Sequence, residues 1–458
     1  MEKKEHFSSK LGFLFAAIGS SVGLGVLWKF PFTVGRNGGG LFILSYILCI
    51  LLIGLPVFIG EILLGRKTQK GAVAAFESLD SSKGWRIGGM LGVIASFLIM
   101  SFYSVVAGWG LSYIVMTLCD FSATLDAQGV SKVFNTLAQS GGISLLWHGI
   151  FTAITMMIVF SGVKEGIEYW SKIMMRLLFV ILSLLVIYNM SLPGFQKAFT
   201  YVIYGEPDSF KPSSVLEALG LAFFTLSLGQ GIMISYGSYM RKNENIPLMC
   251  GFVSIAVIIV ATLAALLIFP VIFSFGFDPS MGTGMVFQAM PFLFAKLLGG
   301  KMIAVAFFSL FVFAAITSSI AFVEVVAVNI MEHHKIDRKK AVVMVCAATF
   351  VLGVPSAYSA SAGIFASWKE VYGMPFLETI DQLVSVWIIP LAGLITSVFL
   401  GWIVKKETLL EEFNHGYKGD KLFHVWHFFI KYVVPCLIVI IILQKSELIN
   451  INALVFKS

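Results

Sequence analysis

The sequence predicts an all-α polytopic membrane protein, and three observations support that fold class. Of its 458 residues, 58% are hydrophobic and only 12% are charged, whereas a typical soluble domain is about 45–50% apolar and about 25% charged. The mean hydropathy is +0.90. The apolar residues form continuous runs, as membrane helices of about 20 residues require, and do not alternate with polar residues as barrel strands would. An ordinary soluble enzyme, a coiled coil and a disordered chain are therefore excluded.

Eleven apolar runs are bounded by charged residues or by glycine and proline, and we predict one transmembrane helix in each. Together they form one domain that covers residues 1–458. In order they are 11–34, between Lys10 and Arg36; 41–65, between Gly40 and Arg66; 88–118, between Arg86 and Asp120; 143–161, between Gly142 and Lys164; 173–191, between Lys172 and Pro193; 215–239, between Pro212 and Arg241; 248–275, between Pro247 and Asp278; 302–330, between Lys301 and Glu332; 341–354, between Lys340 and Pro355; 383–404, between Asp381 and Lys405; and 425–443, between Lys421 and Lys445.

The positive charges predict how these spans are oriented. With the N-terminus placed in the cytoplasm, 20 of the 32 lysines and arginines fall in cytoplasmic segments, 9 in outer segments and 3 within spans. Because connections rich in these residues stay in the cytoplasm, we expect the N-terminus inside and, after eleven crossings, the C-terminus outside. The net charge of +7 is interpreted as this topology signal and predicts no nucleic-acid partner. The five scattered cysteines predict neither a disulfide framework nor a zinc site.

Glycines interrupt two of the spans at matching places. The first span contains GSSVGLG at 19–25, and the sixth, five spans later, contains Gly229 and Gly231. Unwound backbone inside a membrane is tolerated only where it lines a cavity of the protein. Broken helices at corresponding positions of two halves are typical of inverted-repeat transporters, whose substrate binds at the breaks. The predicted halves are residues 11–191, with spans 1–5, and residues 213–404, with spans 6–10; span 11 at 425–443 is extra.

The motifs at these places resemble a known family. LGFLFAAIGSSVGLGVLWKFPF…GRNGGG (11–40), FYSVVAGW (102–109), FFTLSLGQG (223–231), SYGSYMRK (235–242) and ITSSIA (316–321) are similar to those of the neurotransmitter:sodium symporter family. The likeness is greatest to its bacterial LeuT-type amino-acid transporters with eleven spans, and it covers nearly the whole chain in order. It implies a LeuT-like fold, two inverted repeats of five helices plus one helix, in the cytoplasmic membrane of a prokaryote.

The resemblance also implies a site for an amino-acid substrate. The backbone N–H groups of Gly23, Leu24 and Gly25 would hold its carboxylate at a helix N-terminus, and the Tyr103 hydroxyl would donate to the same group. The substrate amine would meet oxygens of Ser21, Phe224, Thr225 and Ser227. A side-chain pocket would be lined by Ile99, Tyr103, Phe224, Ser227, Gln230, Ser318 and Phe322. For Gln230 the sequence leaves two interpretations open, a polar contact to the substrate or a cap on the broken backbone.

Two sodium sites are typical of the family, and only the second keeps all its groups here. Sodium is a hard cation that binds oxygen ligands, as calcium does. The resemblance places the second site at Gly19, Val22, Ala314, Thr317 and Ser318. The alternative for the two hydroxyls is a hydrogen bond back to their own helix.

The first sodium site and the chloride site have lost polar groups. Val26 and Val257 stand where the family carries polar side chains, and valine has no lone pair to offer. Ser21 and Thr225 are kept at the first sodium site, and Tyr46 and Thr225 at the chloride position, where Leu221 and Ala261 replace the remaining polar residues. We therefore predict that the first site is absent or remodelled, that one Na⁺ is bound, and that chloride is not needed.

Gate residues follow from the same resemblance. Lys29 and Asp381 are predicted to pair on the outer side of the site. The inner gate is predicted at Lys4, Ser238, Tyr239 and Glu332. Span 5 departs from the family, because Gly166 is followed by Arg176 where a proline is usual; arginine cannot free the backbone as proline does, and we expect it to reach the cytoplasmic interface.

The leading interpretation is a sodium-coupled symporter that imports an amino acid or a derivative by alternating access within the lipid bilayer. An enzyme is not expected, since the seven histidines lie mostly in loops or near span ends and no metal motif occurs. A channel is not expected either, since no ring of charges or repeated filter occurs. A non-transporting amino-acid sensor and a proton-coupled transporter of the same fold remain as alternatives. The sequence leaves open which amino acid is carried and the oligomeric state.

Overall fold

The computed structural model describes residues 5–80, 82, 84–119, 127–279, 285–361, 365–416, 419–446 and 448. Within this part of the chain every regular element is a helix, as predicted. Nine predicted spans are continuous helical segments: α3 (Gly40–Cys49), η2 (Ile50–Gly54) and α4 (Leu55–Thr68); α6 (Arg86–Leu118); α8 (Gly141–Phe160); η3 (Val163–Glu168) and α9 (Tyr169–Asn189); α13 (Ile246–Ser274); α15 (Gly300–His334); α16 (Arg338–Ala357); α18 (Phe376–Gln382), η6 (Leu383–Ile388), α19 (Ile389–Val398) and η7 (Phe399–Ile403); and α21 (Asp420–Phe428), η8 (Phe429–Val433) and α22 (Val434–Lys445).

The first and sixth spans are broken where the glycines predicted a break. In the first, α1 (Lys10–Ser21) is followed by η1 (Gly25–Lys29) and α2 (Phe30–Arg36), and the two parts are bent by 45°. In the sixth, α11 (Pro212–Thr225) and α12 (Ile232–Ser238) are separated by residues 226–231.

The sixth span needs glycine for its break. Gly229 and Gly231 have φ of 67° and 71°, a left-handed conformation that only glycine adopts without strain. A Cβ on Gly229 would also lie 2.4 Å from the carbonyl oxygen of Ile389. Any other residue at position 229 would therefore strain the backbone and collide with the carbonyl of Ile389, so the break requires glycine here.

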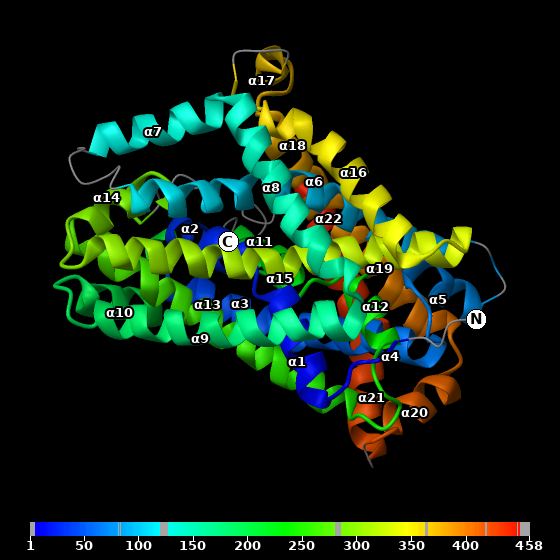
Figure 1. The fold of residues 1–458 in the computed structure, drawn as a ribbon. Coiled ribbons are helices and arrows are strands. Elements are labelled where there is room, and N and C mark those ends of the chain that lie inside the picture. Colours follow the sequence, from blue (N-terminus) through cyan, green and yellow to red (C-terminus); the bar gives the residue numbers. More distant parts are fainter. Residues whose placement is uncertain are drawn as a thin grey trace.

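The broken spans lie inside the bundle, against its longest helix. In Figure 1, α9, α13 and α15 run across the view, and α1 lies among them. α1 packs against α15, α9 and α13, while α12 packs mainly against α4. α1 and α12 are enclosed by other helices, so the ends they expose at the breaks face protein and not lipid.

The remaining helices are short and lie mostly at the ends of the bundle. They are α5 (Ala72–Leu79), α7 (Ala127–Gln139), α10 (Phe195–Ile203), η4 (Pro207–Ser209), α14 (Ala289–Ala295), α17 (Ala366–Tyr372) and α20 (Lys406–Asn414).

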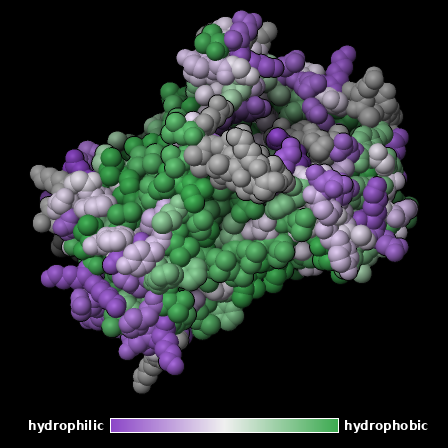
Figure 2. Space-filling view, turned by 180° about the vertical axis from the view of Figure 1, so that it is seen from behind, coloured by the Kyte–Doolittle hydropathy of each residue, from purple (hydrophilic) through white to green (hydrophobic). Residues whose placement is uncertain are grey.

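The outer surface of the bundle is apolar in its middle. Leu48, Val180, Leu184, Ile187 and Phe252 are between 47% and 62% exposed. Figure 2 shows hydrophobic residues over the broad middle of one face and hydrophilic residues gathered toward its ends. Apolar side chains that face outward over this extent belong in lipid. The protein is a multi-pass membrane protein.

Span 5 begins earlier than predicted. The sequence analysis placed its start at residue 173, because of the charges before it, but the helix starts at Val163. Glu168 fits inside because it forms an ion pair with Lys172 and accepts hydrogen bonds from Ser8. α9 continues through Arg176, whose guanidinium carbon lies 5.6 Å from the centre of the Phe15 ring.

Candidate functional site

A small cavity lies where the two broken spans meet α6 and α15. Its free volume is about 10 Å³, which is at the lower limit for one water molecule and too small for an amino acid. The site is therefore closed in this conformation. Ten of the twelve predicted substrate residues line the cavity together with Ser20; Ile99 and Gln230 do not. The lining is Ser20, Ser21, Gly23, Leu24, Gly25, Tyr103, Phe224, Thr225, Ser227, Ser318 and Phe322.

The helix end in the first span is covered by Tyr103. The N–H of Leu24 donates to the Tyr103 hydroxyl over 3.0 Å. A Cβ on Gly23 would lie 2.7 Å from that hydroxyl and 2.2 Å from the Ser318 Oγ, so only glycine allows this close approach. The Tyr103 ring packs edge-on against Phe322 at 5.3 Å. The exposed N–H groups of a helix N-terminus suit an anion, and here a hydroxyl satisfies one of them.

Two serine hydroxyls tie the breaks together. Ser227, which has φ of 55°, donates from its Oγ to the carbonyl of Ser20 over 3.0 Å. Ser318 on α15 donates to the same carbonyl over 3.0 Å. The last carbonyls of a helix have no partner within the helix, and Ser20 stands one residue before the end of α1. The sequence analysis did not single out Ser20, whose role comes from its backbone oxygen.

The groups of the predicted second sodium site lie together at the contact of α1 and α15. The Ser318 Oγ is 3.3 Å from the carbonyl of Gly19. The Thr317 Oγ1 donates back to its own helix, to Phe313 and to Ala314 over 3.1 and 3.0 Å. A Cβ on Gly19 would lie 3.0 Å from the Thr317 Cβ, so the helices touch here. Val22 follows as the C-cap residue of α1. All these donors are oxygens, which fits a hard cation.

The predicted first sodium site is largely apolar. Val26 and Val257 are completely buried, in η1 and α13, and these two elements pack against each other. The Thr225 hydroxyl is already bonded to Tyr46 over 2.7 Å. The Ser21 Oγ is buried with no hydrogen-bond partner among the described residues.

α13 offers one further hydroxyl near Val257. Ser254, one turn earlier, has a fully buried Oγ with no hydrogen-bond partner in the described part of the chain. The sequence analysis did not consider it. At the chloride position Leu221 and Ala261 are buried and bring no polar side chain, which leaves the Tyr46 and Thr225 hydroxyls bonded to each other.

On the predicted outer side, Lys29 and Asp381 are in contact. The Lys29 ammonium is 2.9 and 3.1 Å from the two Asp381 carboxylate oxygens, and 3.3 Å from the Ser385 hydroxyl. It also lies 4.9 Å from the centre of the Phe224 ring, which forms part of the cavity wall. The pair is partly exposed, and together with Phe224 it covers the cavity.

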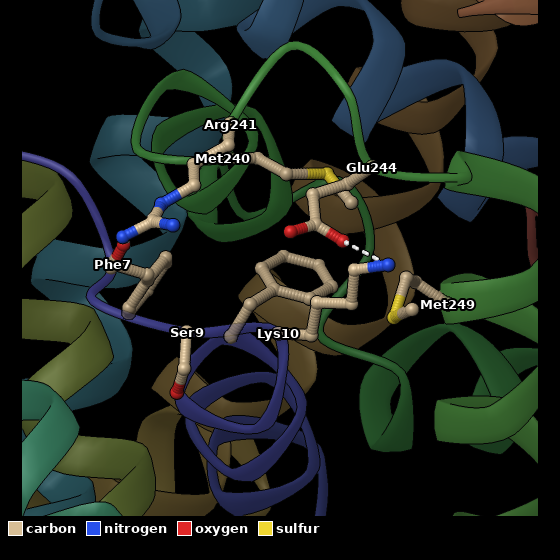
Figure 3. Close-up of a pocket in the computed structure, with 8 residues that line it drawn as sticks. Phe7, Ser9, Lys10, Met240, Arg241, Glu244 and Met249 are labelled. Carbon is tan, nitrogen blue, oxygen red and sulfur yellow. Dashed lines mark hydrogen bonds and ion pairs between the residues drawn. The ribbon is translucent and has the colours of Figure 1, made fainter. Parts of the chain in front are cut away.

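On the predicted inner side, the N-terminal segment is fastened to the loop after α12. Figure 3 shows Arg241 beside Phe7, and Lys10 joined to Glu244 by an ion pair of 3.6 Å. Arg241 donates to the carbonyls of Phe7 and Ser8, and the N–H of Phe7 donates to the carbonyl of Tyr239. The loop and the start of the first span are therefore joined by hydrogen bonds and an ion pair.

Three predicted inner gate residues, Ser238, Tyr239 and Glu332, each have a hydrogen-bond partner in the described part of the chain. Lys4 lies outside the described residues. The Ser238 hydroxyl bonds to Ser235 in its own helix. Both Glu332 oxygens accept from the N–H of Gly71 over 2.9 Å, so this carboxylate caps the start of α5.

Tyr239 instead binds Glu324. Its hydroxyl donates to one Glu324 oxygen over 2.5 Å, and the Arg338 guanidinium donates to the other. Glu324 is completely buried in α15, and Arg338 begins α16 and also donates to the carbonyl of Val159. This cluster was not predicted from the sequence, although an acid within an apolar run is itself a signal for a paired, functional residue.

A second buried acid supports the break in span 6. Glu61 on α4 accepts a hydrogen bond of 2.7 Å from the N–H of Gly229 through its Oε1. Its Oε2 is buried with no partner among the described residues. Glu61 also stands in an apolar run of the sequence, and its contact with the break was not predicted from the sequence.

Gln230 does not cap the broken backbone. Its side chain is 1% exposed, and neither its Nε2 nor its Oε1 has a hydrogen-bond partner among the described residues. Only its backbone carbonyl is bonded, to the Ser96 hydroxyl over 2.7 Å. The sequence left two interpretations of Gln230 open. The capping role requires side-chain hydrogen bonds to the backbone, and Gln230 makes none among the described residues.

Comparisons with known proteins agree with this architecture. The Sodium:neurotransmitter symporter family matches residues 4–136 and 120–458. An uncharacterized sodium-dependent transporter, YhdH of Bacillus subtilis, is 36% identical over 450 residues, which cover 98% of this chain and 99% of the relative. An uncharacterized sodium-dependent transporter of Haemophilus influenzae is 32% identical over 463 residues, which cover 97% and 98%.

Among solved structures, the crystal structure of MhsT in complex with L-phenylalanine superposes with a TM-score of 0.89 at 34% identity, covering 96% of this chain and all of that one. The expected LeuT-like fold is thereby confirmed. The expectation of a transporter and not an enzyme is confirmed by the family match. The chain belongs to the Sodium:neurotransmitter symporter family.

Proposed function

We propose that this protein imports an amino acid together with one sodium ion, by alternating access and without chloride. The observation that carries the single-ion proposal is the contrast between the oxygens gathered at Gly19, Thr317 and Ser318 and the buried valines Val26 and Val257. Two similar proteins are named sodium-dependent transporters, and the similar MhsT binds L-phenylalanine. These names support sodium as the driving ion and an amino acid as the cargo.

The lining of the closed cavity supports the following proposal for how an amino acid is held. Its carboxylate would take the helix end at Gly23, Leu24 and Gly25 in place of the Tyr103 hydroxyl, which would then donate to the substrate. The amine would meet the oxygens of Ser21, Phe224, Thr225 and Ser227. Because the free volume is about 10 Å³, the walls must part before the substrate enters.

The two closures differ in strength. The outer pair of Lys29 and Asp381 is partly exposed, and such a pair contributes about 0–1 kcal/mol. The inner pair of Glu324 and Arg338 is largely buried, and leaving one charge of such a pair buried without its partner costs about 3–5 kcal/mol. With the N-terminus in the cytoplasm, the closed form should open outward first. Tyr239 joins the inner pair to the broken sixth span, so it would transmit opening to the site.

The test is uptake by the purified protein in sealed liposomes, with a panel of labelled amino acids. We expect accumulation with an inward sodium gradient, no accumulation with potassium in place of sodium, and the same rate with gluconate in place of chloride. Accumulation that ignores sodium and follows an imposed proton gradient would replace this proposal with proton coupling. Binding of an amino acid with no accumulation under any gradient would replace it with a sensor.

A further inference from the structure

Gln230, three residues after Ser227 of the cavity lining, is a buried polar side chain whose amide has no partner among the described residues. Its amide carries two donors and one acceptor, and none of them is used within the described residues. Burying an amide without hydrogen bonds costs about 1–3 kcal/mol on the scale of protein mutations. A residue that bears such a cost next to a binding cavity is suited to a hydrogen bond made only when a ligand is present.

The packing of the backbone fixes where Gln230 stands. Its carbonyl binds Ser96 on α6, and a Cβ on the neighbouring Gly231 would touch Val325 on α15 at 3.3 Å. One helical turn from Ser96 is Ile99, and one turn from Val325 is Phe322, which lines the cavity. The backbone at Gln230 is therefore held between α6 and α15, the two helices that line the cavity with Tyr103 and with Ser318 and Phe322.

The charge of the lining limits what such a ligand can be. The residues around the cavity are serine, threonine, glycine, leucine, tyrosine and phenylalanine, with no acid or base among them. Lys29, whose ammonium lies against the Phe224 ring of the cavity wall, is already paired with Asp381. Among these lining residues a charged side chain on the substrate would find no opposite charge, and its burial there would be costly. An uncharged hydroxyl or amide would instead find the Gln230 amide.

We propose that Gln230 selects substrates whose side chain carries an uncharged hydrogen-bonding group, a hydroxyl or a carboxamide. This inference rests on the proposed function, since it assumes that an amino acid occupies the cavity. Widening of the closed cavity brings the side chain of the substrate to the α6–α15 side, where the amide of Gln230 donates to it or accepts from it.

The test compares amino acids that differ in one polar group. Serine against alanine, threonine against valine, glutamine against methionine and tyrosine against phenylalanine are used as competitors of sodium-driven uptake in liposomes. In at least one pair we expect the polar member to inhibit about tenfold or more tightly, because a site built to hydrogen-bond a group rejects the analogue that lacks it. In Gln230→Met the same ratio should fall to about twofold or less.

Matched variants separate specificity from folding. Gln288→Met removes an exposed amide that bonds to Asn135 far from the cavity, and it should keep the ratio of the original protein. Gln230→Leu is a second apolar replacement. Both Gln230 variants should be at least as heat-stable as the original without substrate, since they remove an unsatisfied buried amide.

Three results would overturn the inference: no preference in any pair, a preference that survives Gln230→Met and Gln230→Leu, or a large loss of substrate-free stability, which would indicate a structural cap. If sodium drives uptake of apolar amino acids without such a preference, only this inference fails. If sodium drives no uptake of any amino acid, the proposed function fails.

Discussion

Two contacts of the broken first span have opposite chemistry. Where α1 meets α15, the carbonyl of Gly19 and the hydroxyls of Thr317 and Ser318 come together. Where η1 meets α13, Val26 and Val257 are completely buried. The first contact presents oxygens that a hard cation needs, and the second presents methyl groups that cannot bind one. One broken helix can thus serve an ion on one side and ordinary packing on the other.

The comparison also shows what each contact does when the site is closed. At the α15 contact the hydroxyls already bond to carbonyls, so a sodium ion would exchange protein hydrogen bonds for ion contacts. Near Val26 and Val257 the side-chain hydroxyls of Ser21 and Ser254 lack a hydrogen-bond partner among the described residues. Two hydroxyls are a poor cage for a cation that takes about six or more oxygens in the analogous calcium sites.

The largest effect is expected from Thr317→Val, which removes one oxygen from the polar contact and keeps the shape of the side chain. A hydrogen bond or contact to a charged partner contributes about 1.5–3 kcal/mol, so the half-saturating sodium concentration for uptake should rise roughly 10- to 150-fold. Sodium titration of uptake in liposomes measures it.

Thr349→Val is the matched control. Thr349 is equally buried, and its hydroxyl bonds in the same way to carbonyls three and four residues earlier in its own helix, those of Cys346 and Val345. Its replacement should leave the sodium dependence unchanged. If the two variants behave alike, Thr317 is only a helix residue, and the contact of α1 and α15 is no ion site.

A smaller effect is expected from Val257→Asn, which places an amide in the apolar contact. A buried amide without partners should destabilise the protein by about 1–3 kcal/mol, seen as a lower melting temperature in detergent. The loss should be the same with and without sodium. Sodium that restored the melting temperature of this variant would show that enough of the first site survives to bind an ion.

The smallest effect on sodium is expected from Val26→Ala. Losing two buried methyl groups should reduce the free energy of unfolding by about 1–2 kcal/mol. The half-saturating sodium concentration should change by no more than about twofold, as for independent sites. A larger change, in a variant that stays folded, would tie Val26 to the ion.

The sequence predicted well what lies at the breaks, because glycine clusters mark them directly. Gly229 and Gly231 have the left-handed conformation that breaks span 6, and ten of the twelve predicted substrate residues line one cavity. These residues come from four segments far apart in the sequence, and the resemblance of their motifs to the family predicted that they meet.

The inner ion pair was missed because tertiary packing decides it. Glu324 and Arg338 come together through the turn from α15 to α16, and Tyr239 joins them from a helix more than 80 residues away. The early start of span 5 has the same cause. The charge of Glu168 predicts a loop, but in the fold Ser8 and Lys172 pair with this carboxylate. Pairing of this kind leaves no periodic trace in the sequence.

The central claim is that one sodium ion accompanies each substrate molecule. The most direct measurement is simultaneous uptake of labelled sodium and labelled amino acid into liposomes under a clamped membrane potential. The contrast between the two contacts of the first span predicts a coupling ratio of one sodium per amino acid and a Hill coefficient near one for sodium. A ratio of two, with a Hill coefficient clearly above one, would contradict it and would show that a second ion binds despite Val26 and Val257.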